Sequence, residues 1–157
     1  MRSTCEACMA QILTLDKFIA ALGGRSDAYS ALRIPIRGVV VDSRQVQEGS
    51  IFVALRGEHQ DGHEYVADAF RRGALAAVIE RQLDCSSCLD LGSAEPIVLH
   101  ALTPPLCLLV KDSLAALQQA ATWWRARFSA RVVGITGSIG KTTTKEAIAT
   151  ALGQGYH

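Results

Sequence analysis

The chain has 157 residues, of which 49% are hydrophobic and 20% charged, and its formal net charge is +1. This length suits one domain, or one small domain and part of another, and the composition excludes an extended disordered chain. The near-neutral charge gives no electrostatic argument for binding nucleic acid or an anionic membrane. Residues 1–11 contain one arginine and no continuous apolar run. They therefore predict neither a signal peptide nor a membrane span, and a cytoplasmic location is expected.

The first half of the chain alternates between amphipathic helices and short apolar strands. Residues 14–22 place apolar side chains on one helical face and end at two glycines, which predicts a short core helix. Residues 36–41 and 51–55 are apolar runs bounded by polar turns, and they predict two strands. A helix is expected at residues 64–72, and another strand at residues 74–79.

The middle of the chain is less regular. Residues 82–95 show neither helical nor strand periodicity, which predicts an exposed insert. Residues 97–99 and 106–110 are expected to form two short strands or one interrupted strand. Residues 111–128 repeat apolar positions at steps of three and four residues, which predicts the longest helix.

Two groups of side chains allow a metal-site interpretation. The five cysteines include two Cys-x-x-Cys pairs, Cys5/Cys8 and Cys85/Cys88, but small zinc modules bring such pairs much closer in sequence. Reduced thiols in a reducing cytosol are the favoured interpretation of the cysteines. The other group is His59, Asp61 and His63 in a glycine-containing loop, where a turn that caps a helix or touches a substrate is favoured over a metal site.

The most informative segment is residues 131–144, RVVGITGSIGKTTT. A β-branched run followed by glycines and a Lys-Thr pair predicts a strand, a phosphate-binding loop and the start of a helix. Glycines let backbone N–H groups point inward, and the helix adds the positive end of its dipole. Lys141 is expected to reach the β- and γ-phosphates of ATP, and Thr142 to bind Mg²⁺. The predicted nucleotide-binding residues are Thr136, Gly137, Ser138, Ile139, Gly140, Lys141, Thr142 and Thr143.

These residues carry a resemblance to a known family. Residues 134–146, GITGSIGKTTTKE, resemble the ATP loop of the Mur ligases, in which Gly134 also stands one place earlier than the strict Walker pattern requires. Residues 42–57 and 61–63 are similar to the N-terminal domain of the same family, and all matches follow the family's order. Within the family the loop is most similar to the members that add D-alanyl-D-alanine, and the members that add a diamino acid are the alternative.

The resemblance implies an ATP-dependent amide ligase of peptidoglycan precursor synthesis. ATP and Mg²⁺ would activate the terminal carboxylate of a UDP-N-acetylmuramoyl-tripeptide for attack by the amine of D-alanyl-D-alanine, with Lys141 as the catalytic residue. The UDP end of the substrate is expected at Ser43, Arg44, Asp61, Gly62 and His63. Residues 42–44 could equally form a strand-end turn held by hydrogen bonds between side chain and backbone.

The resemblance also implies a fold and its extent. The expected fold is α/β, with a small mixed-sheet N-terminal Mur ligase domain over residues 1–110. Residues 111–157 would supply a helix and then the first strand, P-loop and helix of a truncated P-loop ATPase domain. The chain is therefore interpreted as the N-terminal portion of a monomeric ligase, inactive by itself. A non-catalytic UDP-sugar-binding module and a P-loop regulator with zinc-bound cysteine pairs remain alternatives.

Overall fold

The computed structural model describes residues 12–23, 29, 31–58, 60–85, 87–92, 102–129 and 131–153. The chain divides into two compact units, Met1–Arg127 and Phe128–His157. The predictions for Cys5, Cys8, His59 and a strand at residues 97–99 concern residues outside the described ranges.

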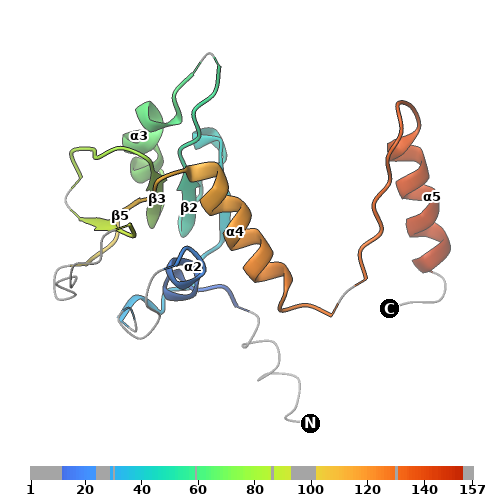
Figure 1. The fold of residues 1–157 in the computed structure, drawn as a ribbon, viewed down its shortest axis with the longest axis horizontal. Helices are drawn as coiled ribbons and strands as arrows, with labels where there is room; N and C mark the ends of the chain where they lie inside the picture. The colour runs from blue at the N-terminus through green and yellow to red at the C-terminus, as the bar shows by residue number, and fades with distance from the viewer. Residues whose placement is uncertain are drawn as a thin grey trace, which may run out of the picture. The chain divides into compact units, whose positions relative to one another are not determined.

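A five-stranded sheet forms the centre of the first unit (Figure 1). Among the described residues all neighbouring strands are parallel, so this sheet is not the mixed one that was expected. Parallel strands need crossover connections that return the chain to the same edge, and the helical segments between β1 and β2 and between β2 and β3 supply two of them. In spatial order the strands are β1 (Gly38–Val40), β2 (Ser50–Val53), β3 (Ala76–Ile79), β5 (Leu106–Leu109) and β4 (Cys88–Asp90).

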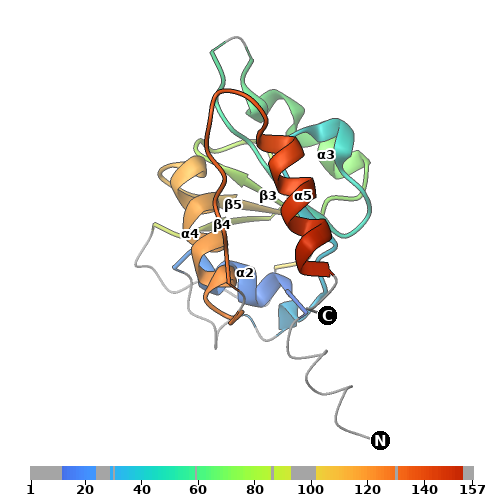
Figure 2. The same ribbon diagram turned by 90° about the vertical axis from the view of Figure 1, so that its right-hand side faces the viewer.

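Helices cover both faces of this sheet (Figure 2). Helices α2 (Leu15–Ala21) and α4 (Ser113–Arg125) pack on one face, and α3 (Val66–Arg71) packs on the other. Two short 3₁₀ helices, η2 (Ser43–Gln45) and η3 (Gly62–Tyr65), follow β1 and β2. The predicted helices and the three predicted strands before residue 80 are all present, with boundaries shifted by a few residues.

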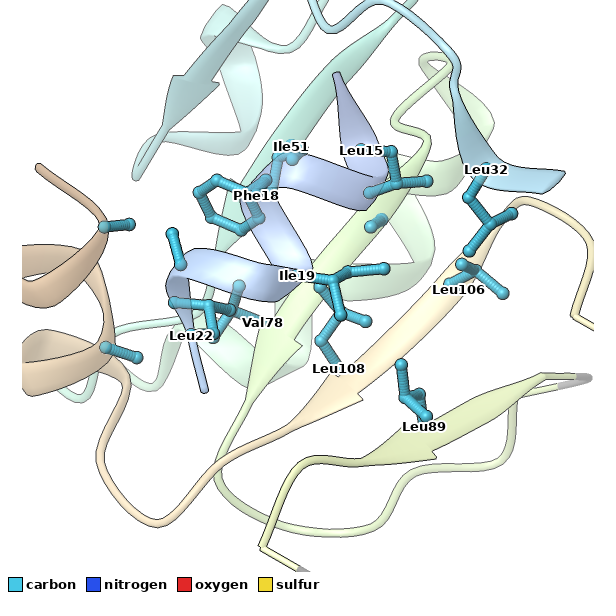
Figure 3. Packing of buried hydrophobic residues seen from close by; sticks show 14 of the residues in the cluster. Leu15, Phe18, Ile19, Leu22, Leu32, Ile51, Val78, Leu89, Leu106 and Leu108 are labelled. Atoms are coloured by element: carbon cyan, nitrogen blue, oxygen red, sulfur yellow. The ribbon is translucent and has the colours of Figure 1, made fainter. Parts of the chain in front are cut away.

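The core follows the period of two that strands impose on their side chains. Ile51 and Val53 of β2 lie in the cluster with α2 and α4, whereas Phe52 of the same strand lies in the cluster with α3. Strands β2 and β3 are buried along their whole length, as parallel strands covered on both faces must be. Figure 3 shows the first cluster, in which α2 lies over the strands. Its labelled members are Leu15, Phe18, Ile19, Leu22, Leu32, Ile51, Val78, Leu89, Leu106 and Leu108.

The segment expected to be an exposed insert contains an edge strand. Strand β4 (Cys88–Asp90) pairs with β5, and its central residue Leu89 is only 1% exposed. Leu89 is the register partner of Leu108, and both lie in the first core cluster. One buried residue between two exposed ones is too short a pattern for sequence periodicity to detect.

The first unit extends past the boundary expected at residue 110. Helix α4 belongs to it because Ala116 and Ala120 are buried in the first core cluster. Within the ranges that the structure describes, no helix is both long and apolar enough to cross a membrane.

The described part of the second unit contains one helix, α5 (Lys141–Gly153). The strand expected before the loop is not formed, since residues 131–137 have no regular structure and Val132 is 73% exposed. A parallel strand depends on hydrogen bonds to a neighbouring strand, and the described residues of this unit provide none.

Candidate functional site

A cleft of about 500 Å³ lies where β1 and β2 end at the carboxyl edge of the sheet. Loops that follow parallel strands meet at this edge, which is where open α/β sheets bind their ligands. Ser43, Arg44 and Gly62, which the sequence predicted for UDP binding, line the cleft, but Asp61 and His63 do not. The complete lining is Val41, Asp42, Ser43, Arg44, Phe52, Gln60, Gly62 and Tyr65.

Asp42 holds the side chain of Arg44 in this cleft. Arg44 Nε donates to Asp42 Oδ1 at 3.0 Å, and Nη2 donates to Oδ2 at 2.8 Å. The Arg44 backbone N–H also donates to Oδ1, so the expected strand-end turn is present as well. These hydrogen bonds lower the pKa of Asp42 to about 2, which keeps the pair ionised at neutral pH. The Arg44 side chain is 83% exposed, so its outer N–H donors face solvent.

Gly62 lets the second loop approach the end of β2 closely. Its N–H donates to the Leu55 carbonyl at 2.9 Å. A Cβ at this position would lie 2.7 Å from the Leu55 oxygen and 2.8 Å from the Leu55 nitrogen, which is closer than real contacts allow. The loop can therefore form this wall of the cleft only with glycine here.

We expect Gly62→Ala to lower the free energy of unfolding by about 1–3 kcal/mol, because the added methyl group pushes the loop away from Leu55. Urea unfolding measures this change. Gly38→Ala is the matched control, since a Cβ at Gly38 meets nothing within 4 Å. It should be neutral or slightly stabilising, through the lower entropy of the unfolded chain. Equal stability of the two variants would contradict the expected close approach.

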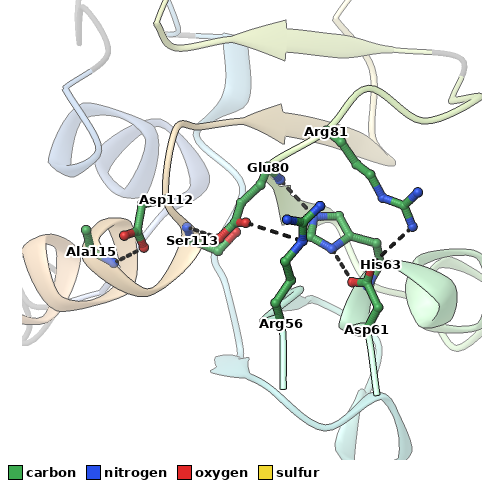
Figure 4. Close-up of polar contacts among 8 residues, drawn as sticks. All are labelled: Arg56, Asp61, His63, Glu80, Arg81, Asp112, Ser113 and Ala115. Atoms are coloured by element: carbon green, nitrogen blue, oxygen red, sulfur yellow. Dashed lines mark hydrogen bonds and ion pairs between the residues drawn. The ribbon is translucent and has the colours of Figure 1, made fainter. Parts of the chain in front are cut away.

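His63 lies beneath this loop and is 3% exposed (Figure 4). The Glu80 backbone N–H donates to His63 Nε2 at 2.8 Å. Because Nε2 accepts, the ring proton is on Nδ1, which donates to Asp61 Oδ1 at 2.5 Å. Both ring nitrogens are occupied within the protein, so His63 is a positioning residue for the loop and has no nitrogen left for a ligand.

Asp61 and Glu80 extend this network along the edge of the sheet. The pKa of Asp61 is lowered mainly by the hydrogen bond from the His63 backbone N–H and further by the hydrogen bond from the His63 ring. Asp61 Oδ2 also accepts a hydrogen bond from Arg81 at 3.2 Å. Glu80 Oε1 accepts from the Ser113 N–H at 2.8 Å, which ties β3 to the start of α4. No role was predicted for Glu80 from the sequence. Its position directly after a buried strand is the signal that could have identified it.

Neither metal interpretation gains support from the described ranges. They contain no group of three or more His, Cys, Asp or Glu side chains that could hold a metal ion. Cys85, Cys88 and Cys107 are free thiols.

Of the predicted nucleotide-binding residues, 136–140 form the loop before α5 and 141–143 form the first turn of that helix. Gly140 has φ +81°, a conformation that glycine adopts without strain, and the Thr144 N–H donates to its carbonyl at 2.9 Å to begin the helix. Lys141 Nζ donates to the Gly137 carbonyl at 2.5 Å. Residues 136–143 are all exposed. The first backbone N–H groups of a helix have no partner within it, so this donor set fits an anion such as a nucleotide phosphate.

The chain thus contains an α/β domain with an open parallel sheet, and its cleft lies at the carboxyl ends of the strands, where domains of this class bind ligands. Residues 35–105 match the Mur ligase family, catalytic domain, and these residues include the whole cleft. Residues 35–105 therefore form a Mur ligase family domain.

Curated relatives support this assignment. The UDP-N-acetylmuramoyl-tripeptide–D-alanyl-D-alanine ligase of Synechocystis is 40% identical over 121 residues, which are 77% of this chain and 23% of that protein. The ligase of the same name from Bacillus subtilis is 38% identical over 121 residues, which again are 77% of this chain and 23% of that protein. The chain therefore spans about a quarter of the length of these relatives.

Solved structures of the family share the fold. A crystal structure of MurF from Acinetobacter baumannii aligns with a TM-score of 0.66 and 28% identity, over 94% of this chain and 29% of that chain. MurF ligase from Thermotoga maritima in complex with ADP aligns with a TM-score of 0.56 and 35% identity, over 76% of this chain and 24% of that chain.

Proposed function

We propose that this chain binds the UDP end of a UDP-N-acetylmuramoyl peptide in the cleft beside Arg44. It would do so as part of an ATP-dependent ligase that adds D-alanyl-D-alanine to UDP-N-acetylmuramoyl-tripeptide. The observation that carries the proposal is that Ser43 and Arg44, which follow β1, and Gly62, which follows β2, line one cleft. The names of the most similar relatives support the reaction, although this chain corresponds to only 23% of the first two.

The cleft offers groups that suit the parts of UDP. A guanidinium pairs well with phosphate oxygens, and the exposed Arg44 would hold the diphosphate. Tyr65 is 36% exposed and provides a flat surface against which a uracil ring would pack. The ion pair with Asp42 fixes the position of the guanidinium before the ligand arrives, which reduces the entropy lost on binding.

The loop before α5 would hold the nucleotide. ATP with Mg²⁺ supplies the phosphoryl group that activates the carboxylate. Lys141 would contact the β- and γ-phosphates, and the Thr142 hydroxyl would bind Mg²⁺. Backbone N–H groups of residues 136–140 and of Thr143 would surround the phosphates, as the exposed donors at the start of α5 allow.

Titration calorimetry with UDP tests the cleft. We expect Arg44→Ala to weaken UDP binding by at least about tenfold, because a charge-assisted contact to phosphate is lost. Arg71→Ala is the matched control, since Arg71 is also an exposed arginine paired with an aspartate but lies outside the cleft. Equal UDP affinity in both variants, or no UDP binding by the native chain, would contradict the proposal.

A diamino-acid-adding ligase is a second candidate. A UDP-N-acetylmuramoyl-L-alanyl-D-glutamate–2,6-diaminopimelate ligase from Cytophaga hutchinsonii is 33% identical over 128 residues. A UDP-N-acetylmuramyl-tripeptide synthetase from Roseiflexus is 39% identical over 120 residues. Displacement of bound UDP by the two muramoyl peptides separates the candidates. Preference for the tripeptide supports the first candidate, and preference for the L-alanyl-D-glutamate form supports the second.

A further inference from the structure

Three cysteines that the proposed function does not use lie together at the β4 edge of the sheet. Cys107 of β5 is fully buried in the core cluster that packs against α3. Cys88 of β4 is its register partner, and register partners on parallel strands project to the same face. Cys85, which precedes β4, packs against the same cluster. The β4–β5 pairing therefore gathers all three thiols on one face.

Cys85 is the central thiol of this group. It lies three residues before Cys88 and packs against the cluster that contains Cys107, and after burial its proximity is the next cause that raises the pKa of both of these thiols. It is half-buried and is one of the residues that line a hollow of about 330 Å³, large enough for a small molecule to approach it. Other residues that line this hollow are His63, Phe70, Leu83 and Pro105.

The two outer thiols are poorly placed to bond to each other. Neighbouring strands lie about 4.8 Å apart, and side chains of register partners keep about that separation. The Cβ atoms of a disulfide lie only about 3.8 Å apart. A bond between Cys88 and Cys107 would therefore require β4 to move toward β5.

The geometry points to Cys85 as the shared partner in an intramolecular disulfide, formed with Cys88 or Cys107 by exchange with a low-molecular-weight disulfide. In the first step the Cys85 thiol loses its proton to solvent, and its sulfur attacks one sulfur of the small disulfide. One small thiolate leaves and takes up a proton. In the second step a neighbouring thiol loses its proton and attacks the Cys85 sulfur, and the second small thiolate leaves and is protonated. Two protein thiols are oxidised, and one small disulfide is reduced to two thiols.

The surroundings make this exchange slow. Burial raises the pKa of Cys107, and burial together with the nearby Cys85 raises the pKa of Cys88 to about 11. Both thiols are therefore protonated at neutral pH, and only a small fraction can attack at any time. Prolonged incubation with oxidised glutathione is the appropriate treatment.

Peptide mapping tests the proposal on the whole chain. Trypsin releases residues 82–111 as one peptide that contains Cys85, Cys88 and Cys107 and neither of the other two cysteines. After incubation with oxidised glutathione and alkylation of the remaining thiols, this peptide should carry one alkyl group and lack two hydrogen atoms. A wild-type peptide with three alkyl groups, or with glutathione adducts alone, would overturn the proposal.

Serine variants identify the shared partner. Cys88→Ser and Cys107→Ser should each still form a disulfide within this peptide, whereas Cys85→Ser should form at least about tenfold less. Circular dichroism checks that the variants are folded. If Cys107→Ser does not fold, the comparison of Cys85→Ser with Cys88→Ser decides. Equal disulfide yields in those two variants would show that Cys85 is not the shared partner.

Discussion

We expect His63→Ala to lower the free energy of unfolding by about 3–5 kcal/mol, because it leaves both a cavity and an unpaired buried donor. The ring is 3% exposed, and its Nε2 is the acceptor for the Glu80 N–H at 2.8 Å. Its Nδ1 proton is bound by Asp61, which also caps η3. The substitution therefore weakens the loop after β2 and its link to β3 together.

Urea unfolding followed by tryptophan fluorescence measures this loss, since both tryptophans lie in α4 of the same unit. Glu64→Gln is the control, because Glu64 is the exposed neighbour of His63 and such changes usually shift stability by less than about 0.5 kcal/mol. A His63→Ala variant within about 1 kcal/mol of the native chain would contradict the positioning role.

The acid limb of the stability curve gives a second measure. Hydrogen bonds from the His63 backbone and ring lower the pKa of Asp61 below its usual 3.8. A carboxyl group with a lowered pKa in the folded state stabilises the fold above its unfolded pKa, and this stabilisation is lost as the pH falls through the folded pKa. His63→Ala removes the ring hydrogen bond and keeps the hydrogen bonds that Asp61 accepts from the backbone N–H of residue 63 and from Arg81. The fall in stability below pH 3.8 should therefore be shallower in the variant.

We also expect this 157-residue chain to bind ATP at least about a hundredfold more weakly than the Thermotoga maritima MurF ligase that was solved with ADP. The loop at residues 136–143 is exposed, and α5 has no buried residue to fix it. Ordering a loose segment costs about 1–2 kcal/mol for each residue fixed, so ordering even two residues can cost a hundredfold in affinity.

Calorimetry with ATP and Mg²⁺ on the two proteins makes this comparison. Lys141→Ala in this chain is the control for specific binding, because Lys141 supplies the cation of the predicted loop. If this chain and the relative bind ATP with equal affinity, and Lys141→Ala abolishes that binding, the loop is ordered without further packing.

Much of this molecule is determined by local sequence. Features that depend only on residues close in sequence were predicted from the sequence. They are the strands β1, β2 and β3, the helices α2 and α4, and the glycine-containing loop before α5. The resemblance carried by residues 42–57 and 134–146 indicated the Mur ligase family, and the matched family domain confirms it.

Tertiary structure decided what depends on residues distant in the chain. Strand β4 exists because β5 pairs with it, and the parallel order follows from crossovers that local patterns do not encode. His63 was predicted to touch a ligand because its hydrogen-bond partner Glu80 lies 17 residues away in the chain, and the local sequence does not indicate that contact. Conversely, residues 132–135 have the composition of a strand but form none, because the hydrogen bonds of a strand must come from a neighbour.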